Sequence, residues 1–391
     1  MNFADVEKLV EMGPRERAAQ MLDMGAELHR RARTPHTRRE LPRQLRRESV
    51  LETVAAPIMD RLHGVRAAAP EKTRGLAETG RVLKTRAGEV TDLVLTPQAR
   101  KSVARSAMDR TQDRSVNDLA IRQLGLGMMD SDPVARCCAA YAYWLATGAD
   151  AAIPVLDNAI DSEDEEERLV GAHCLAKVKP SRVRKLHGTA EDDRPQTPIN
   201  PLQNSMTVII HGTFAKDADW YKPGGDFHTY VKGHVYPDVY SGDDFFFWSG
   251  RYARTDAGLA TIWRQAANKL VSWCASHPAQ TLRLIAHSHG NNVVNMATPR
   301  IPTCTLIQLS PPVRDWNLPD MSTVSSSRFF NIHSRIDLVV KIDGGAQDYR
   351  GTSVASREST KVIGTFGHGA SHDAKKWSKK NVPQLVKTVC P

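Results

Sequence analysis

The sequence has few cysteines, no long apolar run and no region typical of a secretory signal. Its six cysteines are scattered over 391 residues, without the spacing of a metal site or the density of a disulfide scaffold. No segment approaches the ~18 apolar residues of a membrane span, and Asp5 and Glu7 interrupt the N-terminus. We therefore expect buried cysteines, no transmembrane segment and, by default, a bacterial-type cytoplasmic location, with export by a signal-independent route left open.

The composition and the length point to a folded chain with more than one core. Hydrophobic residues make up 41% and charged residues 25% of the sequence, which is the range of globular proteins. A chain of this length exceeds one ordinary core, so we expect two domains, or three if a terminal region is partly independent.

Positive charge is concentrated near the N-terminus. The net charge is +9, and eight arginines fall in one short stretch: Arg30, Arg31, Arg33, Arg38, Arg39, Arg43, Arg46 and Arg47. The stretch lacks interleaved aromatic residues and any zinc-finger or helix-turn-helix signature. We expect a solvated basic face and no specific nucleic-acid partner, while a nucleic acid or an anionic membrane surface stays open as an alternative.

The first half of the chain has helical periodicity and few β-branched runs, so residues 1–185 are predicted to form an all-α domain. Two helix starts, at Asp130-Ser131-Asp132-Pro133 and at Asp161-Ser162-Glu163-Asp164, lie 31 positions apart (130 to 161). Each is followed by an arginine, Arg136 or Arg168, and then by small residues. This pattern resembles a pair of HEAT-like repeats, clearest over 115–180, with a generic helical bundle as the alternative.

A proline-rich segment, 186–204, follows, and its composition predicts an exposed linker. Residues 205–391 then alternate apolar strands with helical segments, which predicts a parallel sheet covered on both faces and hence an α/β domain. The expected strands are 206–210, 244–248, 281–286, 305–309 and 329–333, and the expected helices are 259–275 and 373–389.

One expected strand runs directly into the sequence Ala286-His287-Ser288-His289-Gly290, and a helical segment follows. A turn of this kind is so tight that the residues two before and two after the serine must be small. It lifts the serine oxygen clear of the sheet at the start of a helix. Upstream, a strand ends at His211-Gly212, where glycine allows the backbone to approach a substrate closely.

These motifs, with Asp337 after a later strand and two histidines before the last helix, resemble the α/β-hydrolase superfamily, and specifically its lipase- and esterase-like members. The resemblance implies Ser288 as nucleophile, Asp337 as the acid with Asp315 as fallback, and His372 as the base with His368 as the alternative. It also implies an oxyanion hole formed by the backbone of Thr213 or Phe214 and of His289.

The implied reaction is cleavage of a carboxylic ester through an acyl-enzyme, with no cofactor. The spacing of His368 and His372 would suit a metal on a helix, but Gly367 and Gly369 favour a loop, so no metal is expected. A lipid and a small soluble ester both stay open as the substrate. The alternatives are a helical-repeat scaffold that binds a protein partner and a basic binder of anionic surfaces.

An aromatic segment follows the His211-Gly212 pair. It contains Trp220, Tyr221, Phe227, Tyr230, Tyr236 and Tyr240. Two roles are compatible with this composition: an acyl-binding wall or cover over the site, and ordinary packing against the sheet edge.

Overall fold

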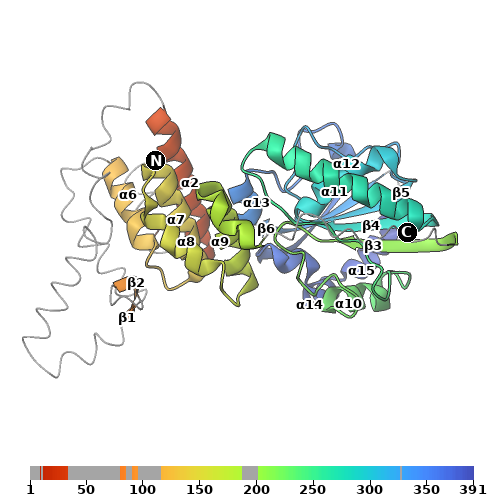
Figure 1. Cartoon of the computed structure of the whole chain (residues 1–391), viewed down its shortest axis with the longest axis horizontal. Coiled ribbons are helices and arrows are strands. Elements are labelled where there is room, and N and C mark those ends of the chain that lie inside the picture. Colours follow the sequence, from red (N-terminus) through yellow and green to blue (C-terminus); the bar gives the residue numbers. More distant parts are fainter. Residues whose placement is uncertain are drawn as a thin grey trace, which may run out of the picture. The chain divides into compact units, whose positions relative to one another are not determined.

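The computed structural model describes residues 9, 12–33, 80–84, 90–95, 116–186, 201–325 and 328–391. The chain divides into two compact units, residues 1–179 and 180–391, each of which is described by itself (Figure 1). Most of the expected linker at 186–204, and most of the arginine cluster, lie outside the described residues.

Unit 1 is mainly helical. Its helices are α2 (Pro14–Arg33), α6 (Val116–Gly127), α7 (Pro133–Thr147), the 3₁₀ turn η3 (Asp150–Ala152), α8 (Ile153–Ala159) and α9 (Glu165–Val178). Helix α7 lies against α2, α6, α8 and α9 and is therefore the centre of the bundle. Between the two expected helix starts, the apolar residues Ile153, Leu156 and Ile160 are buried.

The prediction of an all-α first half is wrong, because unit 1 also contains two strands. β1 (Gly80–Lys84) and β2 (Val90–Leu95) pair in antiparallel register, with Gly80 opposite Leu95. β2 has valine at both Val90 and Val94, and β-branched residues favour extended backbone. Short strands of this kind are hidden when a long segment is read for helical periodicity alone.

The two expected helix starts are built alike. Asp132 and Asp164 are the N-caps of α7 and α9, and each side chain accepts a hydrogen bond from the N–H three residues on. Arg136 donates to the Asp130 carbonyl at 3.0 Å, and Arg168 donates to the Ser162 carbonyl at 2.9 Å. The equivalent residues are 32 apart (132 to 164, 136 to 168), one more than the sequence starts suggested. Both arginines therefore brace the turn before their helix.

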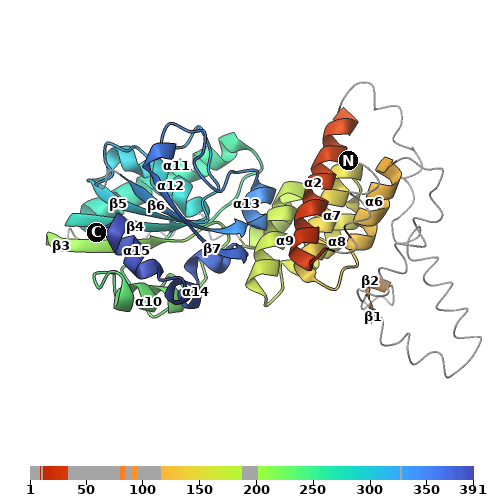
Figure 2. The same ribbon diagram turned by 180° about the vertical axis from the view of Figure 1, so that it is seen from behind.

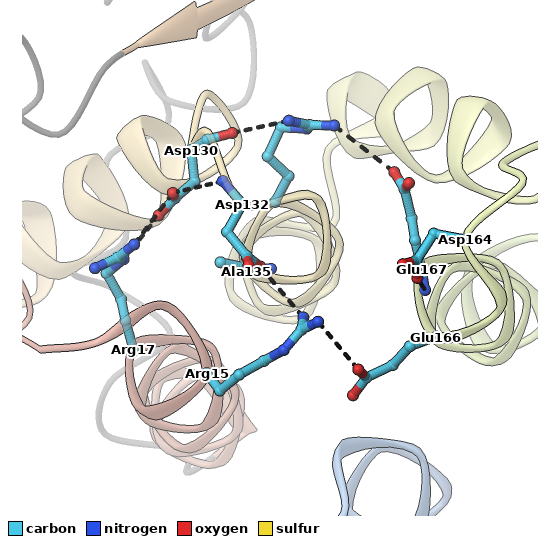
Figure 3. A network of polar contacts seen from close by, with 9 residues as sticks. Arg15, Arg17, Asp130, Asp132, Ala135, Asp164, Glu166 and Glu167 are labelled. Carbon is cyan, nitrogen blue, oxygen red and sulfur yellow. Dashed lines mark hydrogen bonds and ion pairs between the residues drawn. The ribbon is translucent and has the colours of Figure 1, made fainter. Parts of the chain in front are cut away.

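Ion pairs connect α2 with these two helix starts (Figure 3). Arg17 holds both carboxylate oxygens of Asp130 at 2.7 and 3.1 Å, and this pair is buried. Arg15 contacts Asp132 at 3.3 Å and Glu166 at 3.0 Å, so one guanidinium spans the starts of α7 and α9. Helix α2 is thereby fixed to both members of the helix pair.

Unit 2 contains a five-stranded, fully parallel sheet, which confirms the mixed α/β class of the chain. The strands, in spatial order, are β3 (Gln203–Ile210), β4 (Ala279–His287), β5 (Cys304–Leu309), β6 (Phe329–Ile336) and β7 (Glu358–Phe366). The central strand β5 is buried along its whole length, as expected for a strand covered on both faces.

Helices cover both faces of this sheet. α11 (Asp256–Ser276) and α12 (His289–Ala297) lie on one face, and α10 (Asp226–His234), α14 (Ala374–Lys379) and α15 (Val382–Val389) lie on the other (Figures 1 and 2). The remaining elements are α13 (Leu338–Asp343) and the 3₁₀ turns η4 (Pro180–Leu186), η5 (Thr298–Arg300), η6 (Ala355–Arg357) and η7 (Gly369–His372). α11 buries Leu259, Trp263 and Leu270, a helical spacing that faces the core.

The structure corrects two expectations for unit 2 and adds one strand. Residues 244–248 do not form a strand, because Trp248 bonds through both its N–H groups to His211 rather than to a strand neighbour. The expected closing helix is two helices, α14 and α15, separated at Asn381, whose φ is 52°. The edge strand β7 was not predicted, because it is largely polar and half-exposed, with Ile363 its one buried residue.

No helix in the described part of the chain has the length and apolar character to cross a membrane. All six cysteines are buried and free, as expected for small hydrophobic residues. Burial raises the pKa of the Cys137 thiol to about 12, so this side chain is neutral.

Candidate active site

Polar residues gather where the five parallel strands end. His211, Ser288, Ser310, Asp337 and His368 follow β3, β4, β5, β6 and β7, in that order. The carboxyl ends of parallel strands meet at one edge of a sheet, which is the usual location of a site in an open α/β fold. The topology thus brings together residues that span more than 150 positions of sequence.

Ser288 occupies a strained turn between β4 and α12. Its φ is 53° and its ψ is −131°, a conformation that a residue with a side chain rarely adopts. A Cβ at Gly290 would lie 2.6 Å from the His211 carbonyl oxygen, and one at Gly212 would lie 2.6 Å from the Ser288 Cβ. Both glycines are therefore required for the His211 loop to approach the serine, as the sequence pattern predicted for Gly290.

Asp337 pairs with His368. The Asp337 Oδ2 lies 2.8 Å from the His368 Nδ1, and both residues are 2% exposed. Burial alone would raise the pKa of Asp337, but the His368 charge, the His368 hydrogen bond and further bonds from the Val340 N–H and Ser310 hold this pKa below its ordinary value. Asp337 is thus an ionised carboxylate that orients one ring nitrogen of His368.

His372, the base preferred from the sequence, is placed differently. Its ring stacks on Trp220 at a centroid distance of 4.2 Å and meets His287 edge-on at 4.5 Å. Burial is the main cause, and the charge of His368 a smaller one, that lowers the pKa of His372 to about 3. A ring that resists protonation this strongly is poorly suited to accept a proton from a serine. The structure therefore brings Asp337 together with His368, the alternative base.

The loop after β3 offers one clear candidate for an oxyanion donor. The Phe214 N–H already donates to the Gly250 carbonyl at 3.0 Å, so of the two predicted alternatives the Thr213 N–H is the better candidate. His289 is the first residue of α12, where backbone N–H groups have no partner within the helix. A helix N-terminus also favours negative charge, which suits a developing oxyanion.

His211 is a structural residue of this loop. Its Nδ1 bonds the Gly212 carbonyl at 2.8 Å, and its Nε2 accepts from the Trp248 N–H at 3.2 Å. Burial lowers the pKa of His211 to about 4. With both nitrogens engaged and the ring neutral, His211 fixes the loop and does not transfer protons.

The remaining residues considered in the sequence analysis, Asp315 and the aromatic segment, differ in their exposure to solvent. Asp315, the fallback acid, is exposed, whereas Asp337 is buried against His368. In the aromatic segment, Tyr221, Phe227, Tyr236 and Tyr240 are buried as packing, whereas Trp220 is half-buried against the site histidines. Packing is therefore the role that the structure shows for these four residues, and the role of an acyl-binding wall or cover stays a prediction.

Sequence reasoning gave no role to Ser310 or His287. Ser310 has a φ of 46° and donates to the His368 carbonyl at 3.2 Å, and the His287 Nε2 lies 3.3 Å from the same oxygen. Both therefore contact the loop that carries His368. The only available signal was position, since each residue directly follows or ends a buried strand.

No cluster of three histidine, cysteine or acidic side chains in the described residues is arranged to hold a metal ion. A hollow elsewhere in unit 2, along α10, is lined by Pro223, Gly224, His228, Thr229, Lys232, Gly233 and Ser241. None of the residues at the strand ends lines it, so it is not part of the candidate site.

Comparison with known proteins adds no family: no protein-family model matches the chain, and no curated protein is similar to it.

Proposed function

We propose that residues 205–391 form a serine hydrolase of the α/β-hydrolase type that cleaves a carboxylic ester. The observation that carries this proposal is the strained backbone of Ser288, between a buried strand and a helix. The buried Asp337–His368 pair is linked to this turn because the His368 ring contacts that of His287, the residue before the serine, at a centroid distance of 4.6 Å. Strain of this kind persists only where the surrounding structure enforces it, and it is frequent at reacting residues.

Each side chain has a definite role in this reaction. His368 removes the proton from the Ser288 hydroxyl while Asp337 holds the ring and stabilises the imidazolium that forms. The serine oxygen attacks the ester carbonyl, and the N–H groups of Thr213 and His289 bind the oxyanion. Collapse releases the alcohol with the proton from His368, and water then frees the acid from the acyl-enzyme.

Turnover of short p-nitrophenyl esters tests the assignment of the base. Ser288→Ala and His368→Ala should each lower kcat by about 10⁴-fold or more, and the double variant should be no worse, because members of a triad act as a unit. His372→Ala serves as the matched control and should retain far more activity. If His372→Ala abolishes turnover while His368→Ala retains it, the two histidines exchange roles.

For unit 1 we propose a HEAT-like helix pair that presents a surface to a protein partner. The support is the repeated cap and arginine brace of α7 and α9, since stacked helix pairs of similar build form binding surfaces.

A further inference from the structure

A second buried histidine–carboxylate pair lies next to Ser288. It involves His289, whose Nε2 is 3.3 Å from the Asp343 Oδ2, with both side chains 1% exposed. On the other side of the ring, the His289 Nδ1 lies 2.7 Å from the Thr213 hydroxyl. A chain of polar contacts therefore runs from Thr213 through His289 to Asp343.

Asp343 is held firmly at the end of this chain. Arg314 forms an ion pair with its carboxylate and also donates to its carbonyl oxygen at 3.0 Å. The Tyr252 hydroxyl donates to the other carboxylate oxygen at 3.3 Å. The His289 ring thus has the Asp343 carboxylate on its Nε2 side and the Thr213 hydroxyl on its Nδ1 side.

The first two members of this chain, Thr213 and His289, are the residues that supply the proposed oxyanion donors. Thr213 lies in the loop after β3, and His289 begins α12 after β4, so the backbone of each is set by a different element. The bond between the Thr213 hydroxyl and the His289 ring fixes one loop relative to the other. The His289 ring is itself packed against Trp263 at a centroid distance of 5.0 Å.

We propose that His289, Asp343 and Arg314 are positioning residues that set the distance between the oxyanion donors of Thr213 and His289. This inference rests on the proposed hydrolase function. Stabilisation of the transition state is far more sensitive than substrate binding to sub-ångström shifts of the oxyanion donors. Substitution of the positioning residues should therefore lower kcat more than it changes KM.

The test uses the full chain and the variant Thr213→Val, which removes the hydroxyl and keeps a similar shape. Rates are expressed per active site, counted by titration with a fluorophosphonate, so that unfolded protein does not contribute. We expect kcat on a p-nitrophenyl ester to fall about 10-fold or more with KM within about twofold. Affinity for a trifluoromethyl ketone, which forms an oxyanion on the serine, should fall by a similar factor.

Thr213→Ser restores the hydroxyl and should recover most of the lost kcat. His289→Gln interrupts the same chain at its centre and should show the same split between kcat and KM. The matched control is His277→Gln, because His277 also pairs with an aspartate, Asp244, at 2.8 Å but touches none of these residues. The His277→Gln variant should have the wild-type kcat.

The inference would be overturned if Thr213→Val and His289→Gln kept the wild-type kcat and the wild-type affinity for the ketone. It would also be overturned if these variants changed KM alone and left kcat unchanged. These outcomes differ from failure of the proposed function, in which the wild-type protein itself neither titrates at Ser288 nor turns over ester.

Discussion

A histidine buried without an anionic partner resists protonation, and His372 is in this position. Its pKa is lowered to about 3 from an ordinary value of 6.5, mainly by burial. The unfolded chain takes up this proton as pH falls through 6.5, whereas the folded chain does not. Stability from this group is therefore complete above pH 6.5 and declines as the pH falls toward 3.

This linkage gives a prediction for the single residue. When the pH falls from 7 to 5, protonation of His372 in the unfolded chain should lower the free energy of unfolding of the protein by about 2 kcal/mol. Each pH unit below 6.5 lowers this free energy by about 1.4 kcal/mol. His372→Phe keeps an aromatic ring against Trp220 and removes the titration, so urea unfolding of this variant should lose about 2 kcal/mol less over the same interval. Identical pH dependence of the two proteins would show that the pKa of His372 is the same in the folded and the unfolded chain, which would contradict this account.

The residues of the site could be predicted from sequence only as far as local pattern reaches. Ser288 and Gly290 directly follow an apolar strand, so the tight turn could be predicted from the local sequence alone. The choice between His368 and His372 was not, because both lie in one short loop and only the fold decides which ring meets Asp337. The His289–Asp343 pair was also hidden, since 54 positions separate its members (289 to 343).

At the scale of elements, the predictable features were those with a local cause. The Asp caps of α7 and α9 were visible because a cap is a contact over three residues. The polar edge strand β7 was not, because an edge strand needs no apolar run and its pairing with β6 is long-range. The division between α14 and α15 likewise depends on the left-handed backbone of Asn381.

The ion pairs of α2 give a prediction at this scale. Arg17→Met should lower the free energy of unfolding of unit 1 by about 3 kcal/mol, because the buried Asp130 carboxylate loses its guanidinium partner. Arg30→Met is the matched control on the same helix. Arg30 pairs with Glu27 but is 73% exposed, so its loss should destabilise unit 1 far less than the loss of Arg17. Equal effects of the two substitutions, measured by urea unfolding, would contradict this account of the α2 contacts.

At the scale of the whole molecule, the chain is two compact units, 1–179 and 180–391. Every residue assigned to the chemistry lies in the second. A fragment comprising 180–391 should therefore fold and keep ester hydrolysis within about a few-fold of the full chain, as independent domains do. Circular dichroism and p-nitrophenyl ester turnover measure both properties. An insoluble or inactive fragment beside an active full chain would mean that the helical unit completes the hydrolase.

The central claim is that Ser288 is an activated nucleophile, and covalent labelling tests it most directly. The full-length protein is treated with a fluorophosphonate probe, digested, and the labelled peptide identified by mass spectrometry. The account predicts one modified residue, Ser288, and no labelling of Ser288→Ala. Equal labelling of the two proteins, or no labelling of the wild type, would contradict it.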